Sequence, residues 1–433
     1  MRPIIIRGSL AREMILPPEK HESGLPTSGW SAERIIGELT EMHAGDLDPS
    51  EGLHQGWVYD PGEPATSVAG SAMKLYYNAN PLLTGRAFPS LETISNDLVA
   101  IACELLHNHR QSGMVTTGGS ESNLLGVWSA LQLARRSRQI ASPNLVIPYS
   151  AHPSFDKAAM YFDIEVRRAP LDGKFQVDCE AMAALVDDAT VLLVGSAPDY
   201  SHGAVDDITQ LGQMALQRDL PLHVDACVGG FMLPFVERLG RVTPPWDFRV
   251  PGVRSISADV HKHGYGPKGV SVLITDADER VDATSFEFFG WPHGRYVTQT
   301  ICGTRSGAAL AGAWSIFKFL GESGYIQLAR EVMEITDRFR AGIEAVDELY
   351  VLGNPPVNKF SYAASGLDVM AIADGLAARG WIVPKEADPE AIGMHVGLFH
   401  EGAVDHYIED LCLVVEKVRS GELSRGGGAA AYN

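Results

Sequence analysis

The stretch Ser255-Ile-Ser-Ala-Asp-Val-His-Lys-His-Gly-Tyr-Gly-Pro-Lys-Gly269 decides how this chain is interpreted. It begins in an apolar run that is typical of a buried strand, so it places Lys262 at the carboxyl edge of that strand. A single lysine is usually solvated surface, but Lys262 lies between two histidines and ahead of a glycine-rich turn. A crowded cationic pocket would lower the pKa of the Lys262 amine and free it to attack an aldehyde. The sequence therefore predicts a nucleophilic lysine at a sheet edge.

Two further stretches carry residues suited to the same chemistry. Pro221-Leu-His-Val-Asp-Ala-Cys227 places Asp225 at another strand end, where its carboxylate pairs with a pyridine nitrogen or, equally well for this segment alone, caps a helix. Gly113-Met-Val-Thr-Thr-Gly-Gly-Ser-Glu-Ser-Asn123 runs into a helix, and small residues at a helix start let backbone N–H groups approach a phosphate. For that second stretch taken alone, a tight turn with Ser120 as a simple N-cap is the preferred interpretation, so neither segment decides the function alone.

Histidine and serine residues follow two more strand-like runs. His152 can lie flat against an aromatic ring, although a capping or buried histidine has the same signature. Ser196, with His202 close behind it, can approach the phenolic oxygen of the same cofactor. Four strand ends in chain order, each with a residue useful to pyridoxal 5'-phosphate (PLP), are difficult to attribute to chance. The sequence therefore indicates a PLP enzyme that binds a small-molecule amine.

The middle of the chain alternates short apolar runs with helical stretches, which is typical of an α/β fold with a large, mostly parallel sheet. After Gly307 the chain is helical to about Leu349 and then carries shorter strand-like pieces, which predicts a smaller α/β C-terminal domain. We expect an N-terminal segment at 1–80, a large domain at 81–310, a small domain at 311–420 and a flexible tail at 421–433. The expected elements are a helix at 31–43, large-domain strands at 144–148, 190–195, 220–224, 253–257 and 270–275, and small-domain strands at 357–363 and 393–399.

Composition limits the class of protein. The formal charge of −19, from 35 basic and 54 acidic residues, would repel a nucleic-acid backbone, so we expect no nucleic-acid partner. The five cysteines are scattered and odd in number, which indicates reduced thiols in a cytoplasmic protein and neither a disulfide framework nor a metal site. The apolar run near Met1 is too short for a secretion signal, and no apolar stretch reaches the roughly 20 residues that cross a bilayer. We expect no membrane anchor.

Taken together, these segments resemble the sphingosine-1-phosphate lyase family, within the PLP-dependent group II decarboxylases. The resemblance runs from about Gly56 to the C-terminal tail. It implies the aspartate-aminotransferase-like PLP fold type I and a homodimer whose active sites lie at the subunit interface. It is densest at residues 117–122, 223–231, 246–253, 255–269 and 303–307.

The resemblance also implies a role for each matching residue. Lys262 would hold the cofactor as a Schiff base, Asp225 would pair with its pyridine nitrogen, and His152 would stack on its ring. Lys268 would contact the substrate phosphate, and Tyr296 would lie near the catalytic centre. The cofactor phosphate would be held by Gly119, Ser120 and His261, joined by Gly303 and Thr304 of the partner subunit.

One departure from the family concerns the substrate phosphate. Where the family has Asn-Pro-Leu-His, this chain has Asn80-Pro-Leu-Leu, so Leu83 stands in place of the expected histidine. We expect Arg86, with Tyr76 or Tyr77, to compensate, since a guanidinium suits phosphate.

The implied reaction is a retro-aldol cleavage between Cα and Cβ of a phosphorylated amino alcohol, which gives an aldehyde and ethanolamine phosphate. An amino-acid decarboxylase is the alternative, because it uses the same lysine and aspartate and differs in which Cα bond breaks. Lys268 and the closing Gly-Ala-Ala-Ala-Tyr432 favour the lyase. A non-catalytic PLP-binding protein could have lost the lysine and aspartate together, whereas both are present. We interpret Phe286, Phe288, Phe289 and Trp291 as core or interface packing in preference to an aliphatic channel.

Overall fold

The computed structural model describes residues 24–426 of the chain. Most of the expected flexible tail, with Tyr432, lies outside the described residues, as does the N-terminal run from Met1. The described residues form two compact units, with the boundary between Glu51 and Gly52.

The first unit contains α1 (Ala32–His43) and the short η1 (Pro49–Glu51). Ser31 precedes α1, and its side chain accepts a hydrogen bond from the backbone N–H of Arg34 at 3.2 Å, which satisfies one of the unpaired donors of the first turn. The predicted helix at 31–43 is therefore confirmed.

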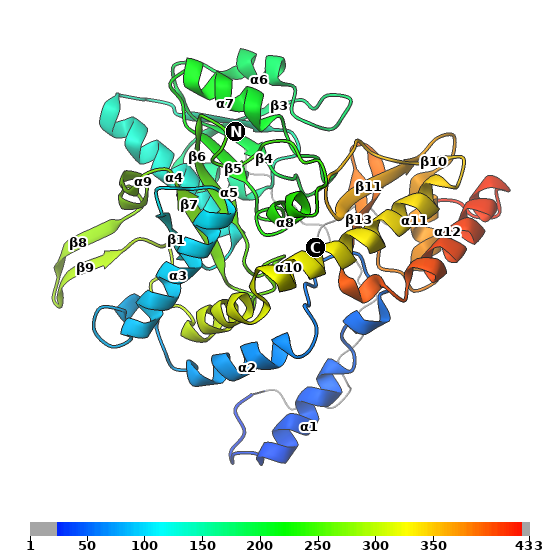
Figure 1. The fold of residues 1–433 in the computed structure, drawn as a ribbon, viewed down its shortest axis with the longest axis horizontal. Helices are drawn as coiled ribbons and strands as arrows, with labels where there is room; N and C mark the ends of the chain where they lie inside the picture. The colour runs from blue at the N-terminus through cyan, green and yellow to red at the C-terminus, as the bar shows by residue number, and fades with distance from the viewer. Residues whose placement is uncertain (1–23, 427–433) are drawn as a thin grey trace. The chain divides into compact units, whose positions relative to one another are not determined.

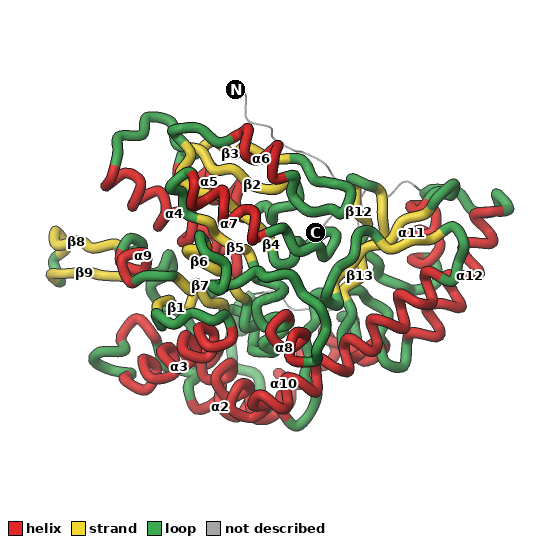
Figure 2. The backbone as a smooth tube through the Cα atoms, turned by 45° about the horizontal axis from the view of Figure 1, so that its top comes forward, coloured by secondary structure: helices red, strands yellow, loops and turns green. Residues whose placement is uncertain are grey.

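The second unit is built on a seven-stranded sheet with the order β1-β7-β6-β5-β4-β2-β3 (Figures 1 and 2). Strands β6, β5, β4, β2 and β3 run parallel, whereas β7 is antiparallel to both of its neighbours, so the predicted mostly parallel sheet is confirmed. The parallel strands end at one edge, which brings the residues that follow them together. The strands are β1 (Ser112–Thr116), β2 (Asn144–Pro148), β3 (Glu165–Ala169), β4 (Thr190–Ser196), β5 (Leu222–Asp225), β6 (Val253–Ala258) and β7 (Ser271–Thr275).

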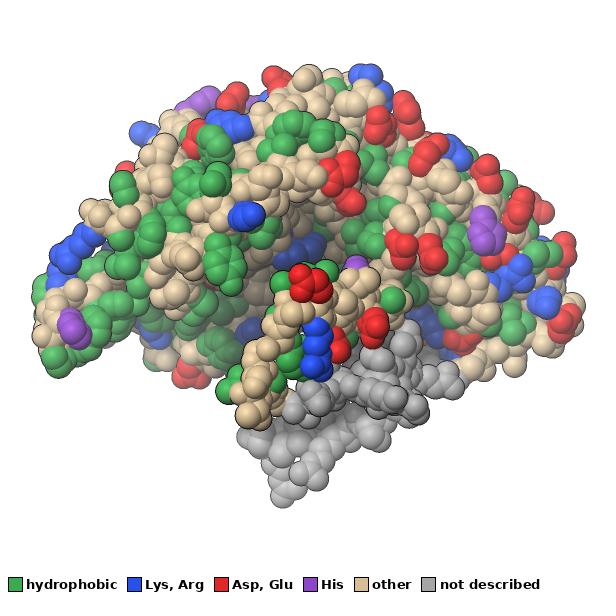
Figure 3. Space-filling view, turned by 90° about the horizontal axis from the view of Figure 1, so that it is seen from below, with side chains coloured by type: hydrophobic (Ala, Val, Ile, Leu, Met, Phe, Trp, Pro, Cys, Tyr) green, Lys and Arg blue, Asp and Glu red, His purple; other side chains and the backbone are tan. Residues whose placement is uncertain are grey.

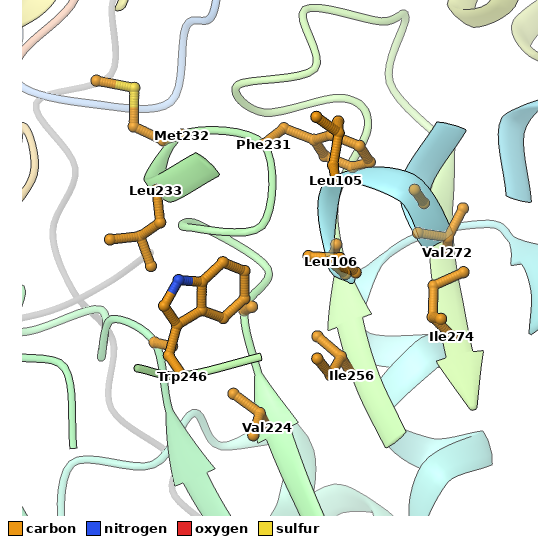
Figure 4. Packing of buried hydrophobic residues seen from close by; sticks show 14 of the residues in the cluster. Leu105, Leu106, Val224, Phe231, Met232, Leu233, Trp246, Ile256, Val272 and Ile274 are labelled. Atoms are coloured by element: carbon orange, nitrogen blue, oxygen red, sulfur yellow. The ribbon is translucent and has the colours of Figure 1, made fainter. Parts of the chain in front are cut away.

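Helices pack along this sheet and bury its apolar side chains. Trp246 is fully buried, and Figure 4 shows its indole among Leu106, Val224, Leu233 and Ile256. Full burial of each aliphatic side chain contributes roughly 1.5–3 kcal/mol, so this cluster stabilises the strands that carry the site. The helices are α3 (Pro89–Leu105), α4 (Gly119–Ser137), α5 (Ser154–Phe162), α6 (Cys179–Leu185), α7 (Ile208–Gln217), α8 (Leu233–Arg238) and α9 (Asp278–Asp282).

A long helix leads from the large sheet to a second, smaller sheet (Figure 1). This helix, α10 (Gly307–Glu344), packs against α2 (Ala65–Leu75) and is interrupted at Gly321, whose φ of 57° lies in the left-handed region that favours glycine. The small sheet is antiparallel with the order β10-β11-β13-β12, and it shares a core with α11 and α12. Its elements are β10 (Leu349–Val351), β11 (Lys359–Ala364), α11 (Val369–Ala377), β12 (Lys385–Ala387), β13 (Glu390–His395) and α12 (Val404–Arg419).

Several strands differ from the sequence-based expectation, and β1, β10 and β12 were not among the expected elements. Strand β3 was not predicted, because Glu165-Val-Arg-Arg-Ala169 has no apolar run and forms an edge of the large sheet. Strand β13 ends at His395 although a strand was expected at 393–399, and η3 (Leu398–His400) occupies the end of that range.

An aromatic hairpin, β8 (Phe286–Trp291) and β9 (Gly294–Thr298), extends from the second unit (Figure 1). The side chains of Phe286 and Phe289 are 57% and 68% exposed, so the interpretation of this cluster as core packing is wrong. Interface packing stays a prediction. Between residues 24 and 426, no helix is both long and apolar enough to cross a bilayer.

Candidate active site

The residues that follow the strand ends surround one cavity of about 360 Å³. Strands β4, β5 and β6 and the start of α4 all reach it, because these elements end or begin at the same sheet edge. The predicted residues Gly119, Ser120, His152, Ser196, Asp225, His261 and Lys262 all line it. The remaining lining residues are Thr117, Gly118, Glu121, Asn123, Pro198, Asp199, Tyr200, Cys227, Val228 and Asp259.

Asp225 ends β5 on the floor of this cavity. Its Oδ2 accepts a hydrogen bond from Asn123 Nδ2 at 2.9 Å, and its Oδ1 accepts one from the backbone N–H of Cys227 at 3.1 Å. Burial alone would raise the pKa of the Asp225 carboxyl, but His152, the Cys227 N–H and Lys262 outweigh that effect and lower it. The carboxylate is therefore held ionised, as pairing with a protonated ring nitrogen requires.

Lys262 faces a carboxylate that the sequence analysis had not singled out. Its Nζ lies 3.1 Å from Asp259 Oδ2. Burial lowers the pKa of the Lys262 amine, but Asp259 and more distant anionic groups outweigh burial, so this pKa is raised. The expectation of a lowered pKa is wrong, because the flanking histidines are not cationic. Burial lowers the pKa of His261, and it lowers that of His263 to about 3.

The start of α4 approaches the cavity more closely than a larger residue would allow. A Cβ at Gly119 would lie 2.6 Å from Cys227 Sγ and 2.8 Å from the Asp259 carboxylate, so only glycine fits there. Glu121 accepts hydrogen bonds from the backbone N–H groups of Thr117 at 2.6 Å and Ile301 at 2.8 Å. The first N–H groups of α4 can bind an anion, and the Glu121 carboxylate holds the neighbouring backbone in place.

His152 follows β2 and lies within electrostatic reach of Asp225 and Lys262. Its Nδ1 accepts a hydrogen bond from the backbone N–H of Ser154 at 3.2 Å. Burial lowers the pKa of His152, with Asp225 opposing the shift. A neutral imidazole held in one orientation suits stacking on an aromatic ring.

The predicted substrate-phosphate residues do not line this cavity. Lys268 Nζ donates to the backbone carbonyls of Trp57 at 3.2 Å and His261 at 3.3 Å, and burial, then Lys262, lowers its pKa. Arg86 and Tyr77 are exposed, and Tyr76 packs against the main core.

The residues predicted to act across a subunit interface also lie outside this chain's own cavity. Tyr296 is part of the aromatic hairpin, and its hydroxyl lies against Gly303, where a Cβ would approach it to 2.8 Å. Thr304 Oγ1 accepts a hydrogen bond from Asn80 Nδ2 at 3.3 Å. His202, although close to Ser196 in sequence, stacks on Phe175 away from the cavity.

Sequence reasoning missed residues that hold the predicted ones in place. Asp259 lies three residues before Lys262, a spacing that could have marked it as a partner. Asn123 lies one helical turn after Gly119 and forms hydrogen bonds with Asp225, Ser154 and His223. No feature of the sequence around Asn123 indicated this role. Tyr59 gave no signal either; its ring lies 4.8 Å below Lys268 Nζ.

A second chamber of about 580 Å³ adjoins the first and shares Ser120, His152 and Tyr200 with it. Glu386 of β12 lines this outer chamber, and its Oε1 lies 3.8 Å from the buried Nζ of Lys359. Burial raises the pKa of Glu386 and lowers that of Lys359. The outer chamber therefore places an acidic side chain of the small sheet on the approach to the first cavity.

The first cavity fits PLP on its own geometry. An ionised aspartate lies on its floor, a lysine amine reaches it from β6, and a helix start bearing a required glycine offers N–H groups to a phosphate. Lys262, Asp225, His152, Ser196, Gly119, Ser120 and His261 are the residues that could hold this cofactor.

The chain is similar to a large group of known proteins. Residues 66–361 match the family model described as "Pyridoxal-dependent decarboxylase conserved domain". The sphingosine-1-phosphate lyase of Oryza sativa subsp. japonica is 34% identical over 415 residues, which cover 94% of this chain and 76% of that relative. A probable L-tyrosine/L-aspartate decarboxylase of Methanothermobacter thermautotrophicus is 34% identical over 309 residues, which cover 70% of this chain and 82% of that relative. The solved structure of a sphingosine-1-phosphate lyase from Burkholderia pseudomallei matches with a TM-score of 0.89 at 34% identity, covering 94% of this chain and 95% of that one.

Proposed function

Because this chain belongs to the pyridoxal-dependent decarboxylase family and, within it, to the sphingosine-1-phosphate lyases, we propose that it cleaves the Cα–Cβ bond of a phosphorylated amino alcohol. The products are an aldehyde and ethanolamine phosphate. The observation that carries the proposal is that Lys262 and Asp225, from neighbouring strands, face one cavity with the glycine start of α4.

The residues of the cavity have distinct tasks in this reaction. When bound, PLP supplies an electron sink for the electron pair of the bond that breaks. Asp225, ionised and fixed by Asn123, keeps a proton on the ring nitrogen. Lys262 binds the cofactor through Nζ, and Asp259, 3.1 Å away, accepts and returns the proton of that amine. His152 orients the ring, and Tyr200 lies between the two chambers, since it lines both.

A PLP-dependent amino-acid decarboxylase is the second candidate, because the Methanothermobacter relative carries that name at the same identity. The lyase ranks first because the lyases match more of this chain, 94% against 70%. Lys268 also supports the lyase, since the charge of Lys262 acts on its amine and that amine donates a hydrogen bond to the backbone of Trp57, which lines the outer chamber.

A homodimer with shared active sites is part of the proposal. The exposed aromatic hairpin supports it, since Phe289 and its neighbours need a partner surface. Gly303 and Thr304 also lie outside their own cavity, as expected if they serve the partner subunit. A monomer that retains full activity, measured by light scattering beside the assay, would contradict this arrangement.

We further propose a cytoplasmic location. All five cysteines are free thiols in the structure, and Cys103, Cys179 and Cys227 are buried. Reduced buried thiols are typical of a reducing compartment.

The experiment that tests the reaction compares two products from the same enzyme. The purified protein is incubated with PLP and either a phosphorylated sphingoid base or a set of common amino acids, and aldehyde and carbon dioxide are measured. We expect aldehyde from the phosphorylated base and no carbon dioxide above a Lys262→Ala control. Carbon dioxide without aldehyde would replace the lyase by the decarboxylase.

A further inference from the structure

A third cavity lies away from the site described above, where loops from both sheets meet over α10. It encloses about 880 Å³, within the usual range for small-molecule sites. The large-sheet part contributes the loops at 173–176, 204–205 and 241–244, and the small-sheet part contributes 353–356. The loops touch, because a Cβ at Gly353 would lie 2.8 Å from the carbonyl oxygen of Lys174.

This cavity is lined by positive charge, although the chain as a whole is acidic. Lys174, Arg241 and Arg340 line it, and none of its other described lining residues is acidic. The whole chain carries 54 acidic against 35 basic residues, and Asp and Glu side chains gather over much of the right-hand surface in Figure 3. A cavity lined by three cations in such a protein needs a specific explanation.

The cations differ in how they are paired. Arg241 is neutralised by Asp337, to which its two Nη atoms donate at 3.1 and 2.6 Å. Within residues 24–426, neither Arg340 nor Lys174 forms an ion pair, so the chamber holds two positive charges without a bonded acidic partner.

Arg340 is the most constrained of the three. Its Nη2 donates to the carbonyl of Val357 at 2.6 Å, its guanidinium lies 4.9 Å over the ring of Phe360, and its buried Nε has no hydrogen-bond partner among the described residues. Burial lowers its pKa to about 10, with Asp337 opposing this shift and Arg241 adding to it, so it stays charged at neutral pH. A buried, unpaired guanidinium is costly unless an anion accompanies it.

We propose that this cavity, which we call the cationic chamber, binds a compact anion with two or more negative charges, such as a phosphate ester or a di- or tricarboxylate. Arg340 and Lys174 supply the positive charge, and guanidinium groups match the oxygens of both anion types. The binding itself does not depend on the reaction proposed above.

The cationic chamber is connected to the active-site cavity by one segment of chain. The loop after β4 lines the active-site cavity with Ser196 and Tyr200 and lines the cationic chamber with Ala204 and Val205. Asp206, which follows Val205, joins the end of this loop to its start, because its carboxylate accepts the backbone N–H of Ser196 at 2.7 Å; it also accepts the backbone N–H of Val177, beside the chamber loop at 173–176, at 2.7 Å. An anion in the chamber therefore restrains the loop that carries Ser196, and we assign it an effector role.

The binding test uses calorimetric titration of the full-length, PLP-loaded enzyme with inorganic pyrophosphate and, separately, with citrate. We expect saturable binding of at least one probe at one site per chain, and the probe that binds identifies the anion type. Arg340→Gln and Lys174→Gln should each weaken that binding at least ten-fold. Lys174 is exposed, so its substitution keeps the test valid should Arg340→Gln fail to fold.

Arg338→Gln is the matched control, because Arg338 lies on the same helix but pairs with Glu401 at 2.8 Å outside the chamber. The Arg338→Gln variant should bind the probe with an affinity within two-fold of the wild type. Lys268→Gln should do the same, which would show that the probe does not bind at the proposed substrate-phosphate region. Absence of saturable binding, or unchanged binding in both Arg340→Gln and Lys174→Gln, would overturn the proposal. Bound probe that leaves KM and kcat of the wild type unchanged would overturn the effector role.

Discussion

The active-site cavity and the outer chamber are neighbours that share Ser120, His152 and Tyr200, yet they are built differently. The first is formed where parallel strands end and α4 begins, so the backbone of the large sheet sets its geometry. The second joins loops of the large sheet to β12 of the small one. If the proposed function holds, the chemistry shared with the family belongs to the first cavity, and the choice of substrate belongs to the loops around the second.

Asp225→Asn tests the strand-edge cavity with the largest expected effect. Loss of the carboxylate leaves the ring nitrogen without a charged partner, so kcat should fall by about 10² to 10³, the size typical of removing one preorganised electrostatic partner. Cofactor content, measured by visible absorption, should remain substantial. Near-normal kcat would show that another group holds that proton.

Lys268→Ala tests the loop region. It should lower kcat/KM for a phosphorylated amino alcohol by roughly ten- to a hundred-fold, the value of one charge-assisted contact, and should change turnover of the dephosphorylated analogue little. Arg86→Ala is the companion variant, expected to lose less because Arg86 is exposed. Equal losses on both substrates would mean that Lys268 does not contact the phosphate.

Asp259→Asn breaks the ion pair between Asp259 and Lys262 in the active-site cavity. Asp259 raises the pKa of Lys262, so its removal should lower that pKa and leave more neutral amine at a given pH. The pH dependence of PLP uptake by the cofactor-free protein, followed by stopped flow, should shift to lower pH. An unchanged pH profile would remove Asp259 from this role.

Substitution of Asp206 is expected to have the smallest effect, a change in how the free energy of unfolding depends on pH. Burial raises the pKa of its carboxyl from 3.8 to about 7. Because the folded pKa is the higher one, the stabilising contribution of the protonated form is complete below about pH 4 and is lost as the pH rises toward 7. Asp206→Asn should remove this part of the slope from the free energy of unfolding, measured by urea denaturation between these pH values. A slope equal to that of the wild type would show that Asp206 is ionised throughout.

The comparison also explains how much the sequence could predict. Lys262, Asp225 and Ser196 were placed correctly, because short apolar runs locate strand ends and parallel strands bring those ends together. The pKa of Lys262 was predicted in the wrong direction, because it depends on a contact with Asp259 and on neutral histidines. Neither the contact with Asp259 nor the neutral state of the histidines can be read from the local sequence.

Elements defined by long-range packing were the least predictable. Strand β3 has polar residues and is recognisable only through its pairing with β2. The aromatic composition of the hairpin predicts core packing, yet the side chain of Phe289 is 68% exposed. The pair of Lys359 and Glu386 is brought together by the small sheet, across a separation that no local pattern spans.

The central claim is that Lys262, and no other lysine, holds the cofactor at the edge of the large sheet. The most direct test is to reduce the PLP-loaded enzyme with borohydride, digest it and identify the modified lysine by mass spectrometry. We expect a single modified residue, Lys262, and no modified peptide from Lys262→Ala, which should also lack turnover. Modification at Lys359 or Lys268 in the wild type, or a reducible adduct that persists in Lys262→Ala, would contradict the claim.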